Sequence, residues 1–171
     1  MKPEFIRDLA FCVLLGSSTV TDLTTRKIYN YITLPAIVFG MAAAIWHGGW
    51  DGFFKSSQGV LAGVAFLLPL VLTGGMGGGD LKLLAAVGAL EGYPFVLEAL
   101  LYSSVCGGVM ALWALTRAGR LVDGLKNCVA AILRLIFPLW PPTVGERPTE
   151  IMIPYGVAIA VGSGIAYLMA R

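Results

Sequence analysis

Two carboxylates beside unusual backbone are the residues of this chain best suited to chemistry. Asp22 begins a polar segment that ends at Asn30, and Asp80 directly follows a run in which five of six residues are glycine. Two carboxylates held close together cannot both ionise cheaply, so they share one proton. The ionised group can then deprotonate a water molecule while the protonated group polarises a carbonyl. Such a pair could hydrolyse a peptide bond with no metal and no covalent intermediate.

The patterns of other catalytic classes are missing from the sequence. His47 is the single histidine, and neither GxSxG nor HExxH occurs. Cys12, Cys106 and Cys128 lie far apart with no CxxC pair, which argues against a zinc or redox site. The net charge of +2 comes from scattered residues rather than a nucleic-acid-binding stripe. We therefore expect no metal, no cofactor and no nucleic acid.

The glycine run before Asp80 predicts irregular backbone. Each glycine in a helix costs about 1 kcal/mol relative to alanine, so a segment this rich in glycine should not be helical. Gly77, Gly78 and Gly79 would instead let an extended peptide approach Asp80 closely. Irregular backbone at membrane depth is tolerated only where protein or a wet cavity covers it.

Each aspartate also has a simpler interpretation. Asp80 could be the N-cap of a following helix, whose dipole stabilises its charge. Asp22 could be an interfacial residue paired with Arg26 one turn further on. These interpretations explain either residue alone, but not why two such carboxylates occur together.

The amino-acid composition indicates that the two aspartates belong to a membrane protein. Of the 171 residues, 57% are hydrophobic and 13% charged, against roughly 25% charged in an average soluble domain. Since a spanning helix needs about 20 apolar residues, we expect an all-α polytopic membrane protein with a single transmembrane domain over 1–171. Its six predicted spans are 5–20, 31–46, 58–73, 80–90, 95–115 and 151–170.

Two apolar segments have a second interpretation. The first span could be a signal peptide, but Glu4 and Asp8 spoil the basic region that such a peptide needs, so we expect a retained helix. Segment 121–140 carries Lys126 and Arg134, which are costly in a span. An amphipathic helix lying in the membrane interface accounts for these charges better.

Counting spans places the two aspartates on one side of the membrane. Asp22 follows one predicted crossing and Asp80 follows three. The connections on that side hold eight of the 12 lysines and arginines, so the positive-inside rule makes this side cytoplasmic and both termini periplasmic. The eight are Arg26, Lys27, Lys82, Arg117, Arg120, Lys126, Arg134 and Arg147.

At these residues the sequence resembles the type IV prepilin peptidases, the bacterial GxGD aspartic proteases. Their first two motifs are matched by Asp22-x-x-x-Arg26-x-Ile28-x-Asn30 and by Gly77-Gly78-Gly79-Asp80-Leu81-Lys82. A third, weaker motif is matched by Pro154-Tyr155-Gly156 before the last span. The bifunctional members carry a methyltransferase region and a zinc-binding loop that have no counterpart here. The chain thus looks like the short, peptidase-only form associated with Flp-type tight-adherence pili.

This resemblance implies a multi-pass inner-membrane endopeptidase with a cytoplasm-facing site. It implies Asp22 and Asp80 as the catalytic pair, with a motif role for Lys82. The implied substrate is a prepilin or pseudopilin precursor, whose short basic leader is cleaved after a glycine. Membrane lipid and pilus assembly machinery are the other expected partners.

Two alternatives remain open at this point. In a small transporter or channel, the glycine run would be a broken helix and Asp80 an ion-coupling carboxylate. In a scaffold of a secretion machine, both aspartates would be purely structural.

Overall fold

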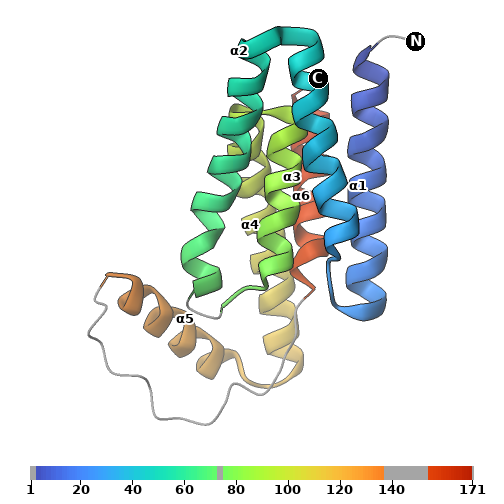
Figure 1. The fold of residues 1–171 in the computed structure, drawn as a ribbon. Coiled ribbons are helices and arrows are strands. Elements are labelled where there is room, and N and C mark those ends of the chain that lie inside the picture. The colour runs from blue at the N-terminus through green and yellow to red at the C-terminus, as the bar shows by residue number, and fades with distance from the viewer. Residues whose placement is uncertain (1–2, 73–74, 137–153, 171) are drawn as a thin grey trace. The chain divides into compact units, whose positions relative to one another are not determined.

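The computed structural model describes residues 3–72, 75–136 and 154–170, and helices joined by short connections account for these residues (Figure 1). The all-α prediction is confirmed for them. The helices are α1 (Pro3–Thr25), α2 (Asn30–Leu72), α3 (Gly78–Glu91), α4 (Tyr93–Arg117), α5 (Leu121–Ile136) and α6 (Tyr155–Met169). By length and composition α2 and α4 could each cross a membrane. The count of six spans stays a prediction.

The chain forms two compact units. The first comprises Met1–Gly107 with Pro154–Arg171, and the second comprises Gly108–Ile153. The expectation of one domain over 1–171 stays a prediction.

Helix α2 is a hairpin of two helical arms. Its helical geometry is interrupted at Gly49, where φ is 56° and ψ is −137°, a conformation that glycine adopts without steric cost. Figure 1 shows the chain reversing direction in this region. The predicted span 31–46 and the described part of the predicted span 58–73 therefore correspond to the two arms; residue 73 lies outside the described residues. Trp50, Phe53 and Phe54 pack edge to face just after the break.

Helix α3 is the central element of the first unit. Its residues 83–90 are all apolar and all buried, as expected of a helical segment that is enclosed on every side. It packs most extensively against α2. A Cβ atom added at Gly59 of α2 would collide with the carbonyl oxygen of Gly88. Glycine is required there because the two backbones touch, as small residues permit between membrane helices.

Helices α1 and α6 and the first part of α4 complete the first unit. Phe11 of α1 stacks on Tyr167 of α6 with ring centroids 5.1 Å apart, and meets Phe95 of α4 edge to face at 5.7 Å. A Cβ atom at Gly162 of α6 would collide with the backbone of Ser103 of α4. Aromatic packing and small residues therefore both bring these helices together.

The helix directions bring distant parts of the sequence to one end of this unit. Figure 1 shows that α1 ends where α3 and α6 begin. Asp22 and Asp80 lie at this end, in the last turn of α1 and the first turn of α3 respectively. The beginning of α1 and the end of α6 lie at the opposite end.

In the second unit, a tight turn joins the end of α4 to α5. Gly119 has φ of 66° in this turn, and the Arg117 guanidinium lies over the ring of Trp113, 4.5 Å from its centroid. Helix α5 exposes apolar side chains that share one face: Leu121, Val122, Leu125 and Val129. The helix predicted over 121–140 extends to Ile136, and residues 137–140 lie outside the described residues. Its interfacial location stays a prediction.

The glycine run differs from the sequence expectation in one respect. Gly77 has extended backbone with φ −76° and ψ 145° and forms the N-cap of α3. Gly78 and Gly79 are already helical, so the prediction of irregular backbone throughout the run is wrong for these two residues. Packing of the rest of α3 in the core offsets their poor helix propensity, because tertiary burial outweighs propensity.

Candidate active site

Asp22 is held by the beginning of α6. Its side chain is buried, with 6% of the residue exposed. The Val157 amide donates a hydrogen bond of 3.1 Å to its Oδ2 atom, and the Gly156 amide also donates to it. Asp22 lies beyond the predicted span 5–20. Burial raises the pKa of its carboxyl group above the ordinary value, and the two amide donors offset part of this rise. The α6 dipole also favours negative charge at this position.

The third motif supplies this contact. Pro154 is the N-cap of α6, and a Cβ atom at Gly156 would lie 2.8 Å from Asp22 Oδ2. Only glycine therefore lets the first turn of α6 approach the carboxylate without displacement. The Tyr155 ring packs beside Gly107 of α4, where an added Cβ atom would lie 3.4 Å from Tyr155 Cε1. The three motif residues thus place α6 against Asp22.

Asp80 is the third residue of α3 and is 9% exposed. Its amide donates to the Gly77 carbonyl at 3.2 Å, and the backbone of Gly77 hydrogen-bonds to its carboxyl group. Since Gly77 is the N-cap and Asp80 is the third residue of the helix, the interpretation of Asp80 as the N-cap is wrong. A Cβ atom at Gly77 would lie 3.4 Å from Asp80 Oδ2, whereas one at Gly78 would meet nothing within 4 Å.

The two carboxylates share one environment although 57 residues separate them in the sequence. The negative charge of Asp22 acts directly on the Asp80 carboxyl group. Both groups are buried. Two charges interact more strongly in a buried environment than in water. The structure therefore brings to one end of the unit the two carboxylates that the sequence singled out.

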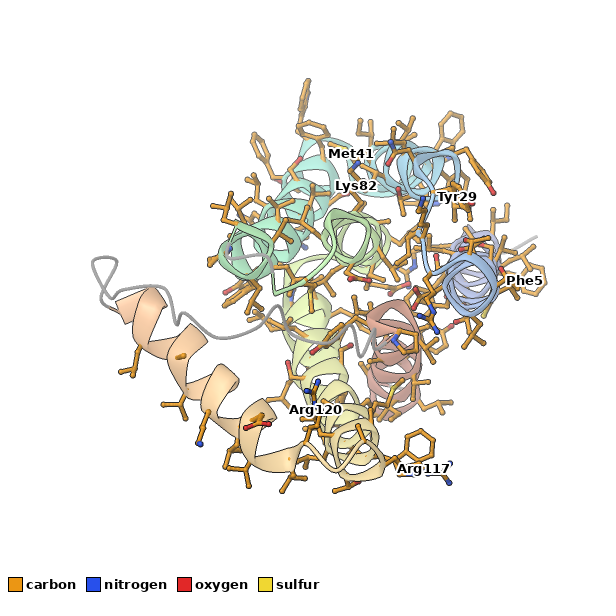
Figure 2. The ribbon with its side chains drawn as sticks, turned by 90° about the horizontal axis from the view of Figure 1, so that it is seen from below. Phe5, Tyr29, Met41, Lys82, Arg117 and Arg120 are labelled. Atoms are coloured by element: carbon orange, nitrogen blue, oxygen red, sulfur yellow. The ribbon has the colours of Figure 1, made fainter. Side chains whose placement is uncertain are left out.

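The polar residues of the first two motifs tie α3 to α2 and close the end of α1. The Lys82 ammonium donates a 2.8 Å hydrogen bond to Asn30 Oδ1, joining the beginnings of α3 and α2. Figure 2 views this end of the helices and shows Lys82 on α3 beside α2, with Tyr29 on the connection to α1. Arg26 closes the last turn of α1 through its amide, 3.0 Å from the Asp22 carbonyl oxygen, and has φ of 53°. Arg26 thus acts here through its backbone.

Two contacts at this site escaped the sequence analysis. Val157 contributes a backbone amide, and no side-chain pattern can indicate such a role. Ile28 belongs to the first motif, but its part in the site depends on contacts with two glycines from distant helices. A Cβ atom at Gly79 would lie 3.0 Å from Ile28 Cβ, and one at Gly156 would lie 2.8 Å from Ile28 Cδ1.

Other possible sites carry less chemistry. Among the described residues, no group of three or more His, Cys, Asp or Glu side chains could hold a metal ion. A cavity of about 620 Å³ lies at the far end of the unit, where α1 begins. Its lining includes Arg7, Trp46 and His47. His47 therefore lies away from both aspartates.

The helical unit buries two carboxylates at one end, and two of the described helices are long and apolar enough to cross a membrane. A model of the type IV leader peptidase family matches residues 9–112, which include both Asp22 and Asp80. The chain therefore belongs to the type IV leader peptidase family, that of the prepilin peptidases. It has no significant match among curated proteins or among solved structures. Family membership makes it a membrane-embedded peptidase whose substrates are prepilins.

Proposed function

We propose that this chain is an aspartic endopeptidase in which Asp22 and Asp80 activate the water that cleaves the prepilin leader. The observation that carries the proposal is the burial of two carboxylates from separate helices at one end of the unit, Asp22 in the last turn of α1 and Asp80 in the first turn of α3. Family membership supports peptide hydrolysis. The contact between Asp80 and a second carboxylate favours hydrolysis over a transporter in which Asp80 acts alone.

The reaction needs one proton shared by the pair. The ionised carboxylate takes a proton from water, and the water oxygen attacks the scissile carbonyl carbon. The protonated carboxyl group meanwhile gives its proton to the carbonyl oxygen, producing a diol. The first carboxyl group then donates its proton to the leaving nitrogen as the C–N bond breaks. A diol hydroxyl returns a proton to the second carboxylate, which restores the starting pair.

The proposed substrate is a short basic leader of a type IV, Flp-like prepilin, cleaved after a glycine at the cytoplasmic face of the inner membrane. The basic residues of the connections that flank Asp22 and Asp80 support a cytoplasmic location of the site. Gly77 and Gly78 support access to the site: the first has extended backbone, and a Cβ atom at the second would meet nothing within 4 Å. An extended peptide backbone could approach Asp80 from this side.

Co-expression with an Flp-type pilin precursor, in a host lacking its own prepilin peptidase, tests this function. We expect the wild-type chain to shorten the precursor and Asp22→Asn and Asp80→Asn each to leave it uncut. Asp51→Asn is the matched control, because Asp51 is an exposed aspartate next to the Gly49 turn. Immunoblots of the membrane fraction should show equal amounts of all four proteins. Cleavage by Asp22→Asn or by Asp80→Asn would show that the substituted aspartate has no part in the mechanism.

A further inference from the structure

Ile28 occupies the space between the backbone segments next to the two aspartates. Its Cβ atom lies 3.0 Å from the position that a Cβ atom would take at Gly79, the residue before Asp80. Its Cδ1 atom lies 2.8 Å from the corresponding position at Gly156, as does Asp22 Oδ2. One side chain thus reaches from the neighbour of Asp80 to the backbone that holds Asp22.

The connection that carries Ile28 is fixed at both ends. Before it, the Arg26 amide bonds to the carbonyl of Asp22, 3.0 Å away. After it, Lys82 holds Asn30 with a bond of 2.8 Å. Ile28 itself is only half-buried and packs against the hydrophobic core. Its β-branched side chain has few rotamers, so it keeps one position while part of the residue stays exposed to solvent.

We infer that Ile28 is the specificity-determining residue of this peptidase, and that its side chain restricts the residue on the amino side of the scissile bond to glycine. This inference rests on the proposed function of Asp22 and Asp80. The scissile carbonyl carbon must come within reach of a water shared by the two carboxylates. The Cα atom of the preceding residue is one bond from that carbon, whereas the Cα atom of the following residue is two bonds away. The side chain that meets Ile28 first is therefore that of the preceding residue.

Substituting Ile28 should create room for that side chain. Ile28→Ala removes three carbon atoms between Gly79 and Gly156, more than the volume of one methyl group. One methyl or methylene group in an apolar pocket discriminates between substrates by about 10- to 200-fold. The variant should therefore accept alanine in place of glycine without changing either aspartate.

The experiment compares purified wild type and Ile28→Ala on two precursors that differ only in glycine or alanine before the scissile bond. The measured quantity is the ratio of kcat/KM for the alanine precursor to that for the glycine precursor. We expect Ile28→Ala to raise this ratio by about tenfold or more. Ile32→Ala is the matched control, because Ile32 is also half-buried against the core but lies on α2. Its ratio should equal that of the wild type.

Three outcomes decide the inference. A raised ratio in Ile28→Ala alone supports it. An unchanged ratio, in a variant that still cleaves the glycine precursor, overturns the role of Ile28 and leaves the proposed function intact. Failure of the wild type to cleave the glycine precursor overturns both. Should Ile28→Ala fail to fold, Ile28→Val keeps the branched shape and should raise the ratio in the same direction by a smaller factor.

Discussion

Helices α3 and α5 form an instructive pair. Both are short and rich in apolar residues, and both carry an aspartate as their third residue, Asp80 in α3 and Asp123 in α5. Residues 83–90 of helix α3 are buried, and Asp80 is buried near a second carboxylate. Helix α5 exposes an apolar face, and its Asp123 is exposed. The same residue at the same helical position is thus buried near a second carboxylate only where the surrounding helices enclose it.

Substituting Asp80 and Asp123 by asparagine should give the largest difference in activity between a change in α3 and a change in α5. Asp80→Asn removes the proposed proton-transfer group. Such groups typically contribute about 10²- to 10⁴-fold, so cleavage should fall by at least about a hundredfold. Asp123→Asn should leave the rate within about twofold, because exposed charges contribute little. Initial rates on one purified prepilin, at equal enzyme concentration, provide the measurement. Equal losses in both variants would contradict the comparison.

A substitution at the beginning of α6, beside Asp22, should cause the next largest loss of activity. Gly156→Ala places a methyl group 2.8 Å from both Asp22 Oδ2 and Ile28 Cδ1. A shift of about 1 Å in a catalytic group can cost about a hundredfold, so we expect kcat to fall by about ten- to a hundredfold. Gly164→Ala, on the same helix, meets nothing within 4 Å and should keep the wild-type kcat. Steady-state kinetics of both variants would show whether the loss is confined to position 156.

Glycine substitutions should then distinguish backbone packing from side-chain packing. A Cβ atom at Gly59 collides with the backbone of α3, whereas the three atoms nearest to one at Gly124 of α5 all belong to the Leu115 side chain. We expect Gly59→Ala to destabilise the protein by about 1–3 kcal/mol, the usual cost of overpacking. Gly124→Ala should be near neutral, because Leu115 can change rotamer and alanine gains up to about 1 kcal/mol in helix propensity.

Thermal unfolding in detergent, followed by circular dichroism, measures both changes. A melting temperature lowered by Gly124→Ala but not by Gly59→Ala would reverse the assignment of tight packing to the α2–α3 contact.

The smallest expected effect concerns the exposed face of α5. In a variant without native cysteines, an environment-sensitive dye on Leu125→Cys should report an apolar surrounding in lipid vesicles, because apolar faces of interfacial helices insert among the lipids. The same dye on Lys126→Cys, on the polar face, should report water. Identical emission from the two positions would argue against an interfacial α5.

Much of the fold class follows from one-dimensional patterns. Apolar stretches predicted the helices, and their observed bounds differ by a few residues at most of the described ends, for example Tyr93–Arg117 against the predicted 95–115. The glycine run is the exception, since Gly78 and Gly79 join α3. Propensity is a local property, and the burial that outweighs it depends on helices far away in the sequence.

The sequence by itself determined the apolar helices, the two unusual carboxylates and, by counting crossings, the expectation that they share a side. These conclusions need only residue types and their order. Only the tertiary structure decided that the Val157 amide holds Asp22, that Ile28 lies between Gly79 and Gly156, and that Gly59 touches Gly88. Such contacts join backbone groups and apolar side chains from distant segments. Their positions are fixed by how whole helices pack, because interiors are close-packed and tolerate little empty volume or overlap.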